Sequence, residues 1–180
     1  MDEPRKLADI FDRSATLKKR VAAEHAGTML AMVGAIADAI AAGGRIFFCG
    51  NGGSAADAQH LATELLIRLR GGVERPSWGA LALTLDAAAL SVGGNDYGFD
   101  MVFARPLSGL GRRGDVLVGI TTSGRSPNVL RALEVAGTMG ITRLGFLGGL
   151  GMPAAGLCEH AIVVPSSETA RVQESHITIG

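Results

Sequence analysis

The chain has 180 residues, of which 47% are hydrophobic and 19% charged, and its 17 basic residues balance 17 acidic ones. The apolar content excludes a disordered chain, and a charge balance without a basic stripe argues against a nucleic-acid partner. The charged N-terminus is unlike a signal peptide, and no run of about 18 apolar residues predicts a membrane span, so we expect a cytoplasmic protein with no membrane partner.

Two helices are predicted before the first strand. Residues 5–26 have a polar, amphipathic pattern, and residues 28–42 have an apolar one that Gly43 and Gly44 stop. Because these helices precede every strand, they cannot connect two strands. We therefore expect residues 1–43 to form an extension that packs on the side of the domain or on another subunit, and the low charge content also favours an oligomer.

Residues 44–180 alternate short apolar runs with helical patterns. Strands are predicted at 45–49, 80–83, 116–120, 142–147 and 161–164, and helices at 55–69, 101–110, 127–139 and from Glu168, with a helical turn at 86–92 and a loop at 93–96. This alternation predicts βαβ units. The expected fold is a three-layer α/β domain with a parallel five-stranded sheet of flavodoxin-like type.

Two loops follow predicted strands at the edge where open parallel sheets bind ligands. The first is Gly50-Asn51-Gly52-Gly53-Ser54, whose glycines allow close backbone approach and whose following helix offers free N–H groups to an anion. It has neither the dinucleotide fingerprint nor a Walker lysine. The alternative for this loop is a tight strand-to-helix turn.

The second loop is Thr121-Thr122-Ser123-Gly124-Arg125-Ser126, which places four hydroxyls at the start of a helix that Pro127 opens. Hydroxyls and helix N–H groups together bind phosphate without a metal. Simple N-capping is the alternative, but a cap needs only one hydroxyl. The loop therefore favours a phosphate site.

Two helices carry candidate ligands or proton-transfer groups. His60 and Glu64 are four residues apart on one helical face, where they could chelate a metal or where Glu64 could act as a base, the alternative being a surface pair. Near the end of the chain, Gln173 and His176 share a face, and spacing alone makes His176 a second imidazole candidate.

Four segments resemble the sedoheptulose 7-phosphate isomerase family (phosphoheptose isomerases) of the sugar-isomerase, or SIS, superfamily, and the likeness extends over essentially the whole chain. They are CGNGGSAADAQHLATEL at 49–65, GNDYGFD at 94–100, GDVLVGITTSGRSPNVLRAL at 114–133 and RVQESHITIG at 171–180. The resemblance implies one SIS domain over 1–180. It implies an aldose–ketose isomerase that converts sedoheptulose 7-phosphate to D-glycero-D-manno-heptose 7-phosphate through an enediol, the first step of ADP/GDP-heptose biosynthesis for lipopolysaccharide and related glycans.

The resemblance also implies roles for individual residues. Substrate would be bound by Asn51, Gly52, Gly53, Ser54, Asn95, Asp96, Thr121, Thr122, Ser123, Ser126 and Gln173, with a threonine at 121 where the family usually has serine. One Zn²⁺ per subunit would be held by His60, Glu64 and Gln173, with Glu64 also an acid/base group. The family's homotetramer, with N-terminal helices in the subunit interface, would account for the helical extension.

This chain departs from the family pattern at the C-terminal end. The family's last histidine, a zinc ligand and the second acid/base group, falls eight residues after Gln173, at position 181, whereas the chain stops at Gly180. His176 matches an inner histidine that is not a ligand in the family. We therefore expect the C-terminal helix to continue past Gly180 and to supply the fourth ligand there.

Two functions of other classes stay open. A SIS protein that associates with a replication initiator has the same expected fold but binds a protein, and a sugar-phosphate sensor would need only the two loops. The initiator-associated family does not retain the helical glutamate, so Glu64 beside His60 favours the enzyme. A sensor gives no reason for His60, Glu64 and Gln173 together.

Overall fold

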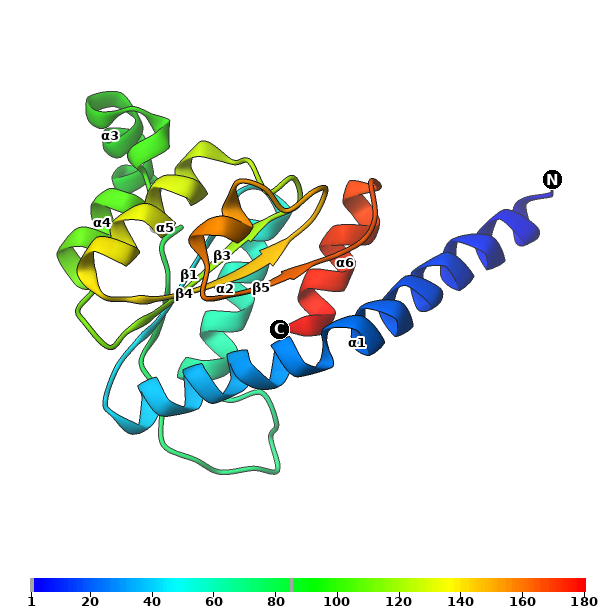
Figure 1. Cartoon of the computed structure of the whole chain (residues 1–180), viewed down its shortest axis with the longest axis horizontal. Coiled ribbons are helices and arrows are strands. Elements are labelled where there is room, and N and C mark those ends of the chain that lie inside the picture. Colours follow the sequence, from blue (N-terminus) through cyan, green and yellow to red (C-terminus); the bar gives the residue numbers. More distant parts are fainter. Residues whose placement is uncertain (1, 85) are drawn as a thin grey trace.

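The computed structural model describes residues 2–84 and 86–180, and it contains a parallel sheet with helices on both faces (Figure 1). The strands lie in the order β2-β1-β3-β4-β5. Their bounds are β1 Ile46–Gly50, β2 Ala80–Ala82, β3 Val116–Thr121, β4 Thr142–Leu147 and β5 His160–Val163. Every neighbouring pair is parallel. The predicted five-stranded α/β fold is confirmed, and each strand lies within one residue of its predicted bounds.

Alternate residues of β1 face the two helical layers. Ile46 and Phe48 pack into a cluster with α1 (Glu3–Ala41), α2 (Gly53–Leu66) and α6 (Thr169–Ile179). Phe47 and Cys49 point the other way, into a cluster with α4 (Ala104–Leu110) and α5 (Pro127–Met139). Because the whole strand is buried, its sequence is a continuous apolar run, as is typical of parallel sheets covered on both faces.

The N-terminal segment forms one helix, so the prediction of two was wrong. α1 runs for 39 residues and continues through Gly27, where nothing lies within 4 Å of the position that a Cβ would occupy. A glycine in an exposed helix interior costs about 1 kcal/mol relative to alanine, and uninterrupted turns on either side outweigh that cost. Although α1 is long, no helix among the described residues has the length and apolar composition needed to cross a membrane.

α1 packs on the domain from Ser14 to its C-terminal end. Val21, Met32 and Ala39 are buried there, and Figure 1 shows the N-terminal turns extending beyond the body of the molecule. Two polar contacts add to this packing: Nε2 of His25 lies 3.2 Å from the carbonyl oxygen of Val163, and Arg13 forms an ion pair with Glu168 at 2.8 Å. The expectation that this extension packs on the side of the domain is thus confirmed from Ser14 onward.

The segment between β2 and β3 contains more helix than predicted. α3 (Ala87–Tyr97) begins after Asp86, whose side chain accepts a hydrogen bond from the backbone N–H of Ala89 at 2.8 Å. It continues through 93–96, where two glycines had predicted a loop, and it ends at Gly98, which has a φ of 84°. The predicted helix at 101–110 divides into a short 3-10 turn, η1 (Phe99–Met101), and α4. No residue of α3 is buried.

Candidate functional site

The glycine-rich loop and the hydroxyl-rich loop lie side by side. β1 and β3 are neighbours, and Gly50 pairs with Ile120, so the segments that follow the two strands emerge at the same edge of the sheet. The side chains of Asn51 and Asn128 join these segments, because Nδ2 of each donates to Oδ1 of the other at 2.8 Å. The prediction that both loops belong to one edge of the sheet is confirmed.

Close packing explains the glycines of the first loop. A Cβ on Gly50 would lie 2.7 Å from the Cβ of Ser54, and Gly52 has a φ of 56°, in the left-handed region that favours glycine. A Cβ on Gly53 would lie 2.9 Å from Oε1 of Gln173, so a glycine here lets α6 approach α2. α2 accordingly begins at Gly53, two residues before the predicted start, and it ends at Leu66, three residues early.

The hydroxyls of the second loop form a cluster. Oγ1 of Thr121 lies 2.9 Å from Oγ of Ser126 and 3.3 Å from Oγ of Ser123, and the backbone N–H of Arg125 donates to Ser123 at 3.2 Å. Ser126 is the N-cap residue of α5, yet its side chain makes no capping hydrogen bond. The N-capping alternative for these hydroxyls therefore does not account for Ser126.

An open cavity of about 460 Å³ lies beside this cluster, at the ends of β3, β4 and β5. Its wall includes Thr122, Ser123 and Arg125 from the hydroxyl-rich loop, and it also includes Ser166, Ser167 and Thr169 from the segment that enters α6. Hydroxyl groups from two loops together with an arginine make a wall that suits a phosphate or a polyhydroxylated ligand. Thr121, by contrast, is buried beneath the loop.

α6 brings Gln173 against the first two turns of α2. Oε1 of Gln173 accepts a hydrogen bond from Oγ of Ser54 at 3.3 Å, and Nε2 donates to Oδ2 of Asp57. Burial raises the pKa of the Asp57 carboxyl, and the hydrogen bond from Gln173 and the charge of His60 offset this only in part. Gln173 of α6 thus contacts α2 at Asp57, one turn before His60.

His60 and Glu64 face one another on α2. Nδ1 of His60 lies 3.7 Å from Oε1 of Glu64, and the side chains are 54% and 24% exposed. An imidazole nitrogen and a carboxylate oxygen are both common zinc ligands. Within residues 2–84 and 86–180, no three histidine, cysteine, aspartate or glutamate side chains converge to hold a metal ion, so a zinc site here would need the Gln173 amide as well.

Asn95 and Asp96 lie on α3, apart from the two loops. Nδ2 of Asn95 donates to Oδ1 of Asp96 at 2.7 Å, both residues are exposed, and α3 packs chiefly on η1. Figure 1 shows α3 standing out from the body of the molecule. Because α3 continues through 93–96, these two side chains lie on a helix and not in a loop. Their predicted contact with the sugar stays a prediction.

His176 is part of the core. It is completely buried, its Nε2 donates to the carbonyl oxygen of Leu147 at 3.1 Å, and burial lowers its pKa. The ring lies 6.2 Å from that of Phe146. The spacing on α6 made this histidine a candidate imidazole, but its surroundings give it a structural role.

Sequence reasoning missed several polar groups of the site. Asn128 is hydrogen-bonded to Asn51, which lies 77 residues away in the chain, and only the tertiary structure pairs the two. The hydroxyls of Ser166, Ser167 and Thr169 reach the cavity because β5 ends beside β4. Asp57 could have been found, because it lies three residues before His60 and seven before Glu64, on the same face of the helix.

Comparisons with known proteins place the chain in a family. A model of the SIS domain matches residues 10–148. The chain is 52% identical to a phosphoheptose isomerase from Pelodictyon phaeoclathratiforme over 97% of its own length and 83% of the relative's. It is 52% identical to one from Chlorobium phaeovibrioides, over 93% of this chain and 79% of the relative.

The chain belongs to the phosphoheptose isomerase family.

Solved structures agree with this membership. The structure of a phosphoheptose isomerase from Neisseria gonorrhoeae superposes with a TM-score of 0.90 at 37% identity, and one from Francisella tularensis with a TM-score of 0.92 at 34% identity. Each comparison covers 99% of this chain and 94% of the other. The resemblance stated from the four sequence segments is therefore confirmed, and the fold is that of the SIS superfamily.

Proposed function

We propose that this member of the phosphoheptose isomerase family is an aldose–ketose isomerase that converts sedoheptulose 7-phosphate to D-glycero-D-manno-heptose 7-phosphate. The observation that carries this proposal is the presence of a hydroxyl-lined cavity and a carboxylate–imidazole pair in a chain about half identical to phosphoheptose isomerases. A phosphate site alone would suit a sensor, and it would leave Glu64 and His60 without a role.

The cavity and the carboxylate have separate tasks in the proposed reaction. Thr122, Ser123 and Arg125 bind the phosphate at one end of the sugar, and that binding energy orients the reacting carbons at the other end. Isomerisation moves a proton between C1 and C2 through an enediol. Glu64 takes the proton from one carbon and returns it to the other, as a carboxylate within reach of both carbons can do.

A zinc ion is part of the proposal. The donors that would hold it are His60, Glu64 and the amide oxygen of Gln173, and here the amide is engaged with Ser54 and Asp57. Zinc bound there would polarise the sugar carbonyl and stabilise negative charge on the enediolate oxygen.

A homotetramer is proposed as the working form. The first turns of α1 extend beyond the domain and expose large apolar side chains, with Leu7 58% and Phe11 74% exposed. Apolar side chains on an unpartnered helix favour burial against other copies of the chain. A cytoplasmic location stays a prediction.

Turnover of sedoheptulose 7-phosphate, followed by proton NMR with added zinc and with a chelator, tests the function. Aldoheptose formation that the chelator abolishes supports both the isomerase and the metal. Turnover that survives chelation keeps the isomerase and rejects a catalytic metal. If a folded oligomer binds the sugar phosphate without turnover, the sensor takes precedence, and if it binds only a replication initiator, the protein-binding alternative does.

A further inference from the structure

Glu64 lies in the last turn of its helix. α2 ends at Leu66, so the carbonyls of Glu64, Leu65 and Leu66 have no partner within the helix. The ends of helices fray when such groups are left to solvent. A carboxylate that transfers a proton has to stay within a fraction of an ångström of its working position.

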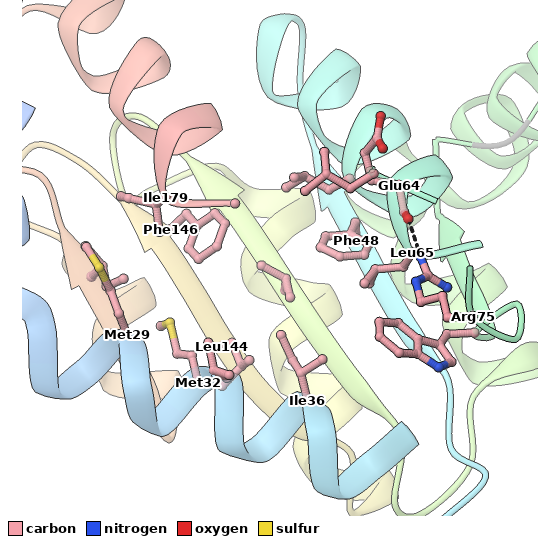
Figure 2. A pocket seen from close by; sticks show the side chains of 17 residues that line it. Met29, Met32, Ile36, Phe48, Glu64, Leu65, Arg75, Leu144, Phe146 and Ile179 are labelled. Atoms are coloured by element: carbon pink, nitrogen blue, oxygen red, sulfur yellow. Dashed lines mark hydrogen bonds between the residues drawn. The ribbon is translucent and has the colours of Figure 1, made fainter. Parts of the chain in front are cut away.

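The loop that follows α2 donates a hydrogen bond to each of these three carbonyls. Nη2 of Arg75 donates to the carbonyl oxygen of Glu64 at 2.6 Å, the backbone N–H of Trp78 lies 3.4 Å from that of Leu65, and Oγ of Ser77 donates to that of Leu66 at 2.5 Å. Figure 2 shows the contact between Arg75 and the main chain of Glu64, with the Glu64 carboxylate pointing away from it. Residues 75–78 therefore form a cap for the C-terminal end of α2.

Arg75 is itself held in place. Its guanidinium carbon lies 3.9 Å above the centre of the Trp78 ring, and Nη1 donates to the carbonyl oxygen of Pro76 at 2.9 Å. Stacking on an aromatic ring restricts the side chain while leaving its N–H groups free to donate. A cation at a helix C-terminus also interacts favourably with the helix dipole. Arg75 is half-buried, and Trp78 lines the apolar groove between α1 and α2.

We propose that Arg75, stacked on Trp78, is a positioning residue for Glu64: it fixes the last turn of α2 by binding the backbone carbonyl of the residue whose carboxylate transfers the proton. This inference rests on the proposed function. Arg75 does not touch the phosphate cavity, whose lining residues come from other loops. Replacing Arg75 should therefore affect the chemical step more than substrate binding.

The test compares Arg75→Ala and Arg75→Lys with two controls in the full chain. Ser77→Ala removes the cap on Leu66 without touching Glu64, and Arg131→Ala removes an exposed arginine that pairs with Glu134 on α5. Arg75→Ala should lower kcat about tenfold and leave KM within about twofold. Arg75→Lys keeps the charge but loses the planar stack, so its kcat should be intermediate. Both controls should keep kcat within about twofold.

Amide hydrogen exchange supplies a readout that does not depend on activity. In Arg75→Ala, exchange should accelerate in the last turn of α2, and the fluorescence of Trp78, the one tryptophan of the chain, should change. The proposal is overturned if exchange accelerates while kcat stays within about twofold, or if Ser77→Ala lowers kcat as much as Arg75→Ala does. If Arg75→Ala does not fold, Arg75→Lys decides by the same two measurements. An inactive wild-type chain would reject the proposed function instead, and the exchange data would still show whether Arg75 fixes the helix end.

Discussion

Asn51 and Asn128 form a reciprocal amide pair across the edge of the sheet, each donating to the other at 2.8 Å. One residue belongs to the glycine-rich loop and the other to the first turn of α5, so the pair fixes the two halves of the candidate site relative to each other. Asn128 also accepts a hydrogen bond from the backbone N–H of Val129 at 3.0 Å, and it is only 2% exposed. Both amides are thus held in one orientation.

Breaking this pair should cost both stability and substrate affinity. Asn128→Ala leaves the Asn51 amide without its buried partner, so we expect a loss of about 1–3 kcal/mol in the free energy of unfolding and a higher KM. Chemical denaturation and steady-state kinetics measure these. A double-mutant cycle with Asn51→Ala should give a coupling of about 1 kcal/mol. Additive losses would show that the two amides act independently.

Replacing the proposed base should remove turnover while sparing phosphate binding. Glu64→Gln keeps the shape of the side chain but cannot accept a proton, so we expect kcat to fall by at least about 100-fold. Inhibition by inorganic phosphate should stay within about threefold, because the phosphate cavity belongs to other elements. Glu134→Gln, an exposed glutamate on α5, is the matched control. Wild-type turnover in Glu64→Gln would reject this role.

The hydroxyl-rich loop should determine affinity for phosphate. Ser123→Ala removes a hydroxyl from the cavity wall, and the loss of one hydrogen bond to a charged group should weaken inhibition by inorganic phosphate about tenfold. Ser108→Ala removes an exposed hydroxyl on α4 and should leave inhibition unchanged. Equal phosphate affinity in both variants would place the phosphate elsewhere.

His60 should be needed for metal retention. We expect His60→Ala to lose most of the zinc that the purified wild-type chain carries, because the imidazole would be one of few protein ligands. Metal content measured by atomic emission tests this without reference to activity. His160→Ala, at the start of β5, is the control. A His60→Ala protein that keeps its full zinc content would contradict the proposed ligand set.

Buried His176 should make the fold less stable in mild acid. Burial lowers its pKa in the folded chain, so below the ordinary value near 6.5 the unfolded chain binds the proton more readily. Its contribution to stability is therefore complete above about pH 7 and is lost as the pH falls through 6.5, with a slope of at most about 1.4 kcal/mol per pH unit. In His176→Gln that part of the slope should disappear from urea titrations at pH 5.5 to 7.5. An unchanged slope would assign the acid sensitivity to other groups.

Local patterns predicted most of the fold. The apolar runs of β1 and β3 are continuous because both faces of the sheet are covered, and Pro127 marked the start of α5. The errors lie where local signals conflict with packing or capping. A break between residues 26 and 28 and a loop at 93–96 were predicted, yet the chain stays helical at both places.

The sequence by itself determined the strands, most of the helices, the two loops and the His60–Glu64 pair, because each depends on residues close together in the chain. The alternation of strands and helices predicted the parallel sheet. Only the tertiary structure decided which of these meet. In the folded chain Asn51 is hydrogen-bonded to Asn128, and Gln173 to Asp57. His176 is buried, and Arg75 donates to a carbonyl at the end of α2. These contacts depend on strand order and on the direction in which the chain returns after each strand, which no local spacing records.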